Sequence, residues 1–198
     1  MSELIDNTYV VFDLETTGLD PKEGNTIIEI GAVRVKNMKV IDRFSELINP
    51  NTPLSADINR ITGITDDMLK DCDTEENVLK RFIAWAGDDI LVAHNASFDL
   101  SFIKIAFLKY DLGRFNYDVI DTLGISRFLE PFEKYHNLTV LMNRYKIVWD
   151  EGKHHRADYD SEGTSRVLYA MLTKLREKNI VSFENLSKIP RIILNKRI

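Results

Sequence analysis

The chain has 198 residues, 44% of them apolar and 29% charged, with a formal net charge of −5. This length can bury about 70% of the unfolded surface in one core, so no second domain is required, and the negative charge argues against a protein that grips a long duplex by neutralising many phosphates. The single cysteine excludes a disulfide framework, and the first residues are neither basic nor continuously apolar, so we expect a cytoplasmic protein that does not bind membranes.

Hydrophobic periodicity predicts strands and helices in a definite order along the chain. The second and third strands form a hairpin that turns at Lys36 and Asn37. Three antiparallel strands followed by strands that alternate with helices predict an α/β fold: a mixed five-stranded sheet with helices on both faces. The predicted strands are 8–15, 26–36, 39–48, 90–93 and 117–120; the predicted helices are 75–86, 97–110, 137–145 and 158–178, with short turns around 55–60 and 66–70.

Two carboxylates interrupt the first predicted strand. Asp13 and Glu15 are two residues apart, so they share one face of the strand with Cα atoms roughly 6.5–7 Å apart, while Val10, Phe12 and Leu14 form the other face. Such a pair can be a solvated strand face. In a half-buried position, however, the two charges repel each other and lose hydration. A pair of divalent cations would remove that penalty and provide a site for hydrolysing a phosphodiester.

Two more acids head apolar stripes on predicted helices. Positions three, four, seven and eight apart share a helix face, so Asp99 lies above Phe102, Ile103 and Ala106, and Asp160 lies above a similar stripe. Both acids are expected to face inward from the first turn. The helix dipole favours a carboxylate there only modestly, and metal ligation explains the core-facing position better.

His155 stands five residues before Asp160, just ahead of the predicted helix. An imidazole is not a preferred ligand for an all-oxygen Mg²⁺ or Mn²⁺ site. With an ordinary pKa of about 6.5 it can accept a proton near neutral pH. We therefore interpret His155 as the base for the attacking water.

Three segments together resemble the exonuclease motifs of the DEDDh superfamily of 3′→5′ exonucleases, in order and with suitable separations. They are 13–19, 94–99 and 155–160. The resemblance covers nearly the whole chain, and it is nearest to the proofreading exonuclease domain of PolC-type bacterial replicative polymerases and to the epsilon proofreading subunit of DNA polymerase III. Further stretches that support it are 27–33, 49–50, 54–55, 62–69 and 120–122.

The resemblance implies a ribonuclease H-like fold and two divalent cations, Mg²⁺ or Mn²⁺. The implied metal ligands are Asp13, Glu15, Asp99 and Asp160; His155 is the implied catalytic histidine, and Glu15 is counted with it as catalytic. Only His155, and not its neighbour His154, has the family spacing to Asp160. The implied activity is hydrolysis of DNA from single-stranded or frayed 3′ ends to release nucleoside 5′-monophosphates, in proofreading, with a replicative DNA polymerase as a candidate partner.

Candidate contacts to the terminal nucleotide come from three places. The segment after the first acids resembles the edge that touches this nucleotide, and Ile61 could wedge against its base or pack in the core. One of Phe98 and Phe102 could face the nucleotide, with packing between helix and sheet the default for Phe98. An asparagine before a helix is also typical of a helix cap. The candidate residues are Thr16, Thr17, Gly18, Leu19, Ile61, Asn95 and Phe102.

We expect residues 1–180 to form the exonuclease domain and 181–198 to be a C-terminal tail of unknown role. Two other functions stay open on the sequence. An exoribonuclease acting on RNA 3′ ends could use the same five residues, because no decisive reader of the 2′-hydroxyl is evident. A polymerase-binding module with secondary catalysis is the other alternative.

Overall fold

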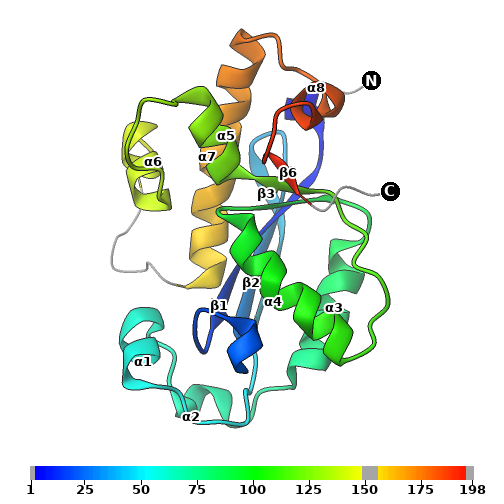
Figure 1. Cartoon of the computed structure of the whole chain (residues 1–198), viewed down its shortest axis with the longest axis vertical. Coiled ribbons are helices and arrows are strands. Elements are labelled where there is room, and N and C mark those ends of the chain that lie inside the picture. The colour runs from blue at the N-terminus through cyan, green and yellow to red at the C-terminus, as the bar shows by residue number, and fades with distance from the viewer. Residues whose placement is uncertain (1–2, 149–155, 195–198) are drawn as a thin grey trace.

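The computed structural model describes residues 3–148 and 156–194. One sheet runs through the molecule in the strand order β3-β2-β1-β4-β5-β6 (Figure 1). Strands β1, β4 and β5 are parallel to one another, and the remaining pairings are antiparallel. The strands are β1 (Tyr9–Thr16), β2 (Ile27–Lys36), β3 (Lys39–Leu47), β4 (Ile90–Ala93), β5 (Val119–Asp121) and β6 (Ile193–Leu194). The predicted mixed α/β sheet is therefore confirmed.

The helices follow the predicted order. Helix α3 has the bounds predicted from periodicity, and α4 and α7 begin within one residue of the prediction. Two helices that the sequence did not predict, α5 and α8, follow β5 and α7. The helices are α1 (Ala56–Thr62), α2 (Asp66–Leu69), α3 (Glu75–Ala86), α4 (Ala96–Lys109), α5 (Thr122–Leu129), α6 (Leu138–Arg144), α7 (Ala157–Glu177) and α8 (Phe183–Ser187), with single 3₁₀ turns at Leu4–Asp6 and Pro21–Glu23.

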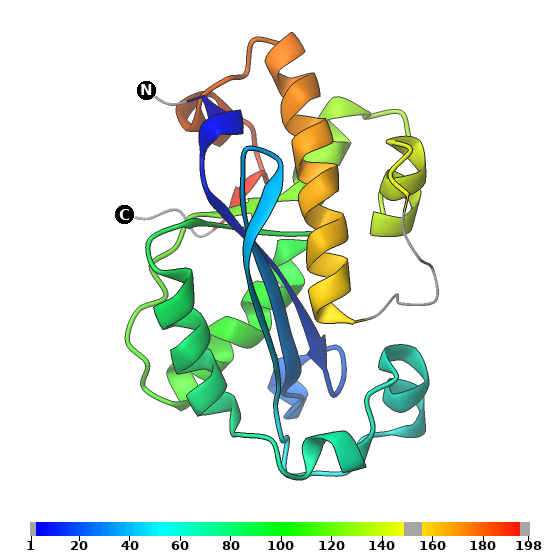
Figure 2. The ribbon, with the colours of Figure 1, turned by 180° about the vertical axis from the view of Figure 1, so that it is seen from behind.

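The two faces of the sheet are covered by different helices. Figure 2 shows α7 on one side of the strands and α3 and α4 on the other. Alternate residues of β1 enter the two cores: Val10, Phe12 and Leu14 pack with residues of α3 and α4, whereas Tyr9 and Val11 pack with residues of α7. By this alternation, Asp13 and Glu15 point toward the α7 side.

The strand count of five is wrong by one. Strand β6 is antiparallel to β5, and the segment that carries it buries Leu186 and Ile192 completely. A two-residue strand is too short to show alternation in sequence, which is why it was missed. Residues 183–194 thus pack onto the domain. No described helix has the length and apolar character needed to cross a bilayer.

Helix α7 lies against β2 at a position where only glycine fits. A Cβ on Gly31 would lie 2.1 Å from the carbonyl carbon of Ala157, the first residue of α7. A side chain at Gly31 would push the start of α7 off the sheet. The missing side chain therefore sets how closely Asp160, in the first turn, approaches the strands.

Candidate active site

Three of the four predicted metal ligands meet at the carboxyl end of β1. One carboxylate oxygen from each of Asp13, Glu15 and Asp160 lies within 4.8 Å of the others. Asp160 is 6% exposed, and the two β1 acids are half-buried. This donor set consists of oxygen alone, which is the chemistry that Mg²⁺ and Mn²⁺ prefer over softer metals. The residues present therefore fit a divalent cation.

A fifth acid, Glu29, lies beside this cluster but is held by other groups. It is directly opposite Glu15 in the β1–β2 pairing and is fully buried. Its carboxylate accepts hydrogen bonds from Nη2 of Arg156 at 2.9 Å and from the backbone N–H of Ala157 at 3.2 Å. Glu29 thus caps α7 and fixes its first turn to β2, which positions Asp160. Sequence reasoning missed this pair because its partners are separated by 127 residues.

Asp99 approaches the cluster from the other side of the sheet. It lies in the first turn of α4, is 2% exposed, and is hydrogen-bonded by the backbone of Leu14. It is outside the group of three that meets within 4.8 Å. Its charge is nevertheless the strongest carboxylate influence on Asp13. The predicted inward orientation of Asp99 and Asp160 is confirmed by the burial of both.

Burial and crowding disfavour the ionised forms of these acids. Burial raises the pKa of Asp13 well above its usual range, and the charges of Asp99 and Glu15 raise it further. Burial, followed by the charge of Glu29, raises the pKa of Glu15 to about 8. Burial also raises the pKa of Asp99 to about 8. Positive charge bound among them would oppose all of these shifts.

The start of α4 is capped by an acid from another element. Asp121, at the end of β5, accepts the N–H groups of Asn95 at 2.9 Å and Ala96 at 3.3 Å. Asn95 occupies the N-cap position of α4, but its side chain makes no capping hydrogen bond, so the expected capping by its side chain is wrong. The backbone of Asn95 is left-handed, with φ at 61°, and its side chain is exposed. Asn95 therefore has a side chain available to a ligand.

The side chain of His94, the residue before Asn95, is hydrogen-bonded within the protein. Its Nδ1 lies 2.9 Å from Oγ1 of Thr122, and burial lowers the pKa of its imidazole to about 4. The ring is therefore neutral near pH 7, and it links the end of β4 to the start of α5. This geometry supports a structural role for His94 in the loop.

The predicted nucleotide-contacting edge follows β1 directly. Hydrogen bonds within the loop hold it: Oγ1 of Thr16 donates to the carbonyl of Gly18 at 2.7 Å, and Oγ1 of Thr17 accepts from the N–H of Thr26 at 3.0 Å. The apolar side chain of Leu19 is 85% exposed, and that of Ile61 on α1 is 44% exposed. Both could contact a base. Their contact with substrate stays a prediction.

Phe102 lies in the hydrophobic core. It is 2% exposed and packs in the core beneath α4, where its ring is 5.2 Å from that of Phe98. Phe98 is the more exposed ring of this pair. A role of Phe102 in substrate binding stays a prediction. His155 and His154 lie outside the described residues.

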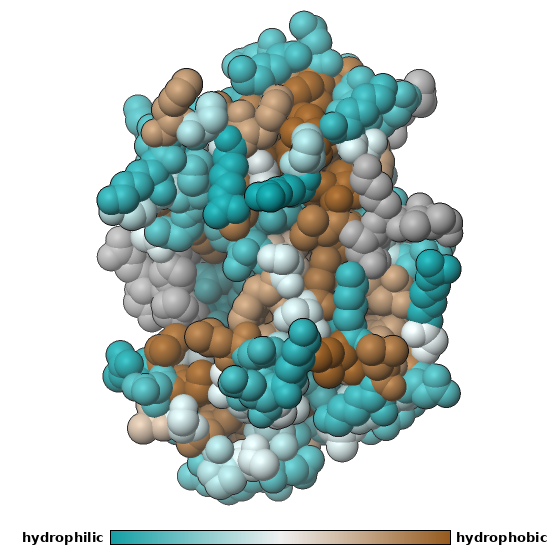
Figure 3. Space-filling view, in the orientation of Figure 1, coloured by the Kyte–Doolittle hydropathy of each residue, from teal (hydrophilic) through white to brown (hydrophobic). Residues whose placement is uncertain are grey.

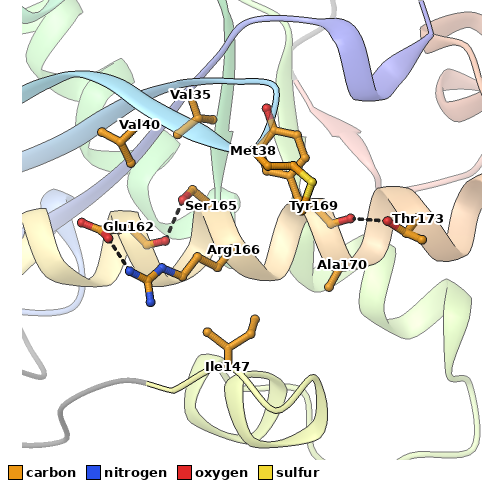
Figure 4. Close-up of a pocket in the computed structure, with 10 residues that line it drawn as sticks. All are labelled: Val35, Met38, Val40, Ile147, Glu162, Ser165, Arg166, Tyr169, Ala170 and Thr173. Atoms are coloured by element: carbon orange, nitrogen blue, oxygen red, sulfur yellow. Dashed lines mark hydrogen bonds and ion pairs between the residues drawn. The ribbon is translucent and has the colours of Figure 1, made fainter.

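One pocket lies away from these acids. It has a volume of about 440 Å³ and is formed by the β2–β3 hairpin, the middle of α7 and Ile147 (Figure 4). None of the candidate site residues lines it. Its walls are mostly apolar, and its polar edge is closed by the ion pair between Arg166 and Glu162. The carboxylate cluster, rather than this pocket, is thus the candidate site of chemistry.

Solved structures with the same fold support this assignment. Exonuclease X in complex with 5′-overhanging duplex DNA superimposes with a TM-score of 0.71 at 29% sequence identity, covering 91% of this chain and 98% of that one. The nuclease domain of 3′hExo, a DEDDh family member bound to rAMP, has a TM-score of 0.74 at 22% identity, covers the same shares of the two chains and shows the fold alone.

Relatives in sequence are longer bacterial proteins. The PolC-type DNA polymerase III of Bacillus subtilis is 47% identical over 186 residues, which are 93% of this chain and 13% of that protein. The PolC-type polymerase of Listeria welshimeri is 46% identical over 182 residues, 92% of this chain and 12% of that protein. The chain thus spans about one eighth of these relatives. The family model described as "Exonuclease" matches residues 10–168. The chain belongs to this exonuclease family.

Proposed function

We propose that this exonuclease removes nucleotides one at a time from single-stranded or frayed DNA 3′ ends, releases nucleoside 5′-monophosphates, and serves as the proofreading activity of a bacterial replicative DNA polymerase. The observation that carries the proposal is the meeting of Asp13, Glu15 and Asp160 within 4.8 Å, with Asp99 beside them. The PolC-type relatives support the polymerase partner, and the DNA complex of Exonuclease X supports a DNA substrate.

The residues have separate tasks in this proposal. Asp13, Glu15, Asp99 and Asp160 would hold two divalent cations, Mg²⁺ or Mn²⁺, which when bound supply positive charge against the phosphate and activate water. The loop 16–19 and Ile61 would hold the terminal nucleotide. His155 would take the proton of the attacking water on a ring nitrogen.

Discrimination against mispairs would be indirect. A mismatched terminus costs less free energy to unpair, so it reaches a site restricted to single strands more often. The exposed apolar side chains of Leu19 and Ile61 suit this task, because stacking and apolar contacts accept any base.

Digestion of 5′-labelled oligonucleotides tests the proposed function. With Mg²⁺ or Mn²⁺, we expect a ladder of shortening products, fastest from single-stranded DNA, slower from a mismatched primer and slowest from a paired primer, because only unpaired ends enter the site. Asp13→Asn is the inactive control.

Equal rates on the three DNA substrates would contradict proofreading. Cleavage within a circular strand would contradict exonuclease action. Faster digestion of an RNA of the same sequence would favour the exoribonuclease alternative.

The acid cluster predicts a specific pH dependence of stability without metal. A carboxyl group with its folded pKa raised to about 8, as for Glu15 and Asp99, contributes stability that is complete below its unfolded pKa of about 4 and is lost as pH rises through 8. In EDTA, the free energy of unfolding should therefore fall between pH 5 and pH 8. Adding Mn²⁺ at pH 8 should raise it again.

A matched pair of variants shows whether the buried acids cause this pH dependence of stability. Asp99→Asn should flatten the fall in EDTA, because the buried charge is gone. Asp57→Asn, at an exposed acid paired with Arg60 on α1, should leave it unchanged. A parent protein with no loss of stability toward pH 8, or one that Mn²⁺ does not stabilise, would argue against the cluster as a cation site.

Variants of the two adjacent histidines test whether His155, and not His154, is the base. His155→Ala should lower kcat by on the order of 10²–10⁴, the scale of a positioned general base, and should remove the acidic limb of the pH–rate profile near the ordinary histidine pKa. His154→Ala should change neither. If His154→Ala is the inactive variant, or both keep the full rate at neutral pH, the assignment of the base is wrong.

A further inference from the structure

A groove of about 550 Å³ borders the start of α4, the helix that carries Asp99. Asn95, the N-cap residue of α4, lies on its wall, and Asp99 follows four residues later in the first turn of the helix. The other walls are α5 and the segment 189–194. Figure 1 shows the start of α4, α5 and β6 meeting in this part of the molecule.

Two arginines line this groove, Arg127 on α5 and Arg191 in the tail segment. Both are exposed, and neither is in an ion pair with another described residue. Apart from these two and Arg114, every arginine in the described part of the chain is paired with a carboxylate. In a chain with a net charge of −5, two of the three unpaired arginines among the described residues thus line this groove.

The acid in the groove is bonded to the backbone and not to an arginine. Asp121 lines the floor, but one of its oxygens accepts three backbone N–H groups, from Asn95, Ala96 and Leu123. Burial raises the pKa of Asp121 on balance, although these donors and the charge of Arg127 act in the opposite direction. Its Oδ1 atom is already taken up by the backbone of α4 and α5.

Apolar surface lies next to the arginines. The ring of Phe128 is 38% exposed, and Pro190 and Leu194 lie opposite it along the groove. Figure 3, in the orientation of Figure 1, shows hydrophilic and hydrophobic side chains side by side in this region. The amide of Asn95 adds a hydrogen-bond donor at the end nearest Asp99. Arginine, an aromatic face and an amide donor are the groups that bind a single nucleic acid strand through its phosphates and bases.

We propose that this groove binds the single-stranded part of the substrate that lies 5′ of the scissile phosphate, with Arg127 and Arg191 on its phosphates and Phe128 against a base. The proposal rests on the proposed function and extends it, because it assigns the path by which the strand leaves the carboxylate cluster. A strand held here is unpaired over several nucleotides, which gives the enzyme a preference for frayed ends that its catalytic acids alone do not provide.

Substrates of two lengths distinguish binding in the groove from hydrolysis at the catalytic centre. The p-nitrophenyl ester of thymidine 5′-monophosphate occupies only the centre, whereas an oligothymidylate of eight nucleotides also reaches the groove. The variant Arg127→Gln/Arg191→Gln should lower kcat/KM for the octamer on the order of tenfold, mainly through KM, and should hydrolyse the ester at the parent rate. The plot of log(kcat/KM) against log[salt] should become shallower by about 0.7 for each lost phosphate contact.

Two controls use similar residues outside the groove. Arg114→Gln removes the third unpaired exposed arginine among the residues that the structure describes, and it should leave the octamer kinetics and the salt slope unchanged. Phe128→Ala should raise KM for the octamer without changing the salt slope, because stacking is not a charge effect, whereas Phe132→Ala, at a fully exposed ring (101%), should change neither.

The outcomes distinguish the groove from the activity itself. Unchanged octamer kinetics in the double arginine variant would overturn the proposal while the parent enzyme still digests DNA. An equal loss on the ester and the octamer would also overturn it, since the arginines would then act through the catalytic centre. Failure of the parent to digest any oligonucleotide would instead refute the proposed function.

Discussion

The gathering of buried carboxylates at the end of β1 is the constraint on which the rest of the structure depends. Asp13 and Glu15 sit on a strand that is paired with β2 at both positions, opposite Gly31 and Glu29, so the backbone keeps the two acids close together. Burial and crowding raise their pKa values, which means that the protein without cations stores an unfavourable interaction there. The fold must hold that arrangement by contacts elsewhere, and a divalent cation turns it into a binding site.

One kind of contact, a strand carboxylate that accepts the first N–H groups of a helix, positions both Asp99 and Asp160. Each comes from the first turn of a helix whose leading N–H groups are accepted by a carboxylate on a strand. Glu29 on β2 accepts the N–H of Ala157 and so places Asp160; Asp121 at the end of β5 accepts those of Asn95 and Ala96 and so places Asp99. Two structural acids thus position two candidate ligands.

Local patterns predicted much of this arrangement. Alternation placed Asp13 and Glu15 on one face, and helical spacing turned Asp99 and Asp160 inward. What the sequence could not provide were contacts between distant segments, such as the pair of Glu29 with Arg156, and elements with too few residues to show a period, such as β6. Capping of α4 by the side chain of Asn95 was one alternative, because asparagine is a common local cap, whereas in the structure the carboxylate of Asp121 from the neighbouring strand accepts the N–H groups.

Cation binding at the cluster can be observed directly in crystals soaked in MnCl₂, with anomalous scattering recorded at the manganese absorption edge. The structure predicts anomalous peaks in direct coordination with Asp13, Glu15, Asp99 and Asp160, with Glu29 still bound to Arg156 and α7. Crystals without a peak at these four carboxylates, or with manganese coordinated by Glu29, would contradict the proposed site.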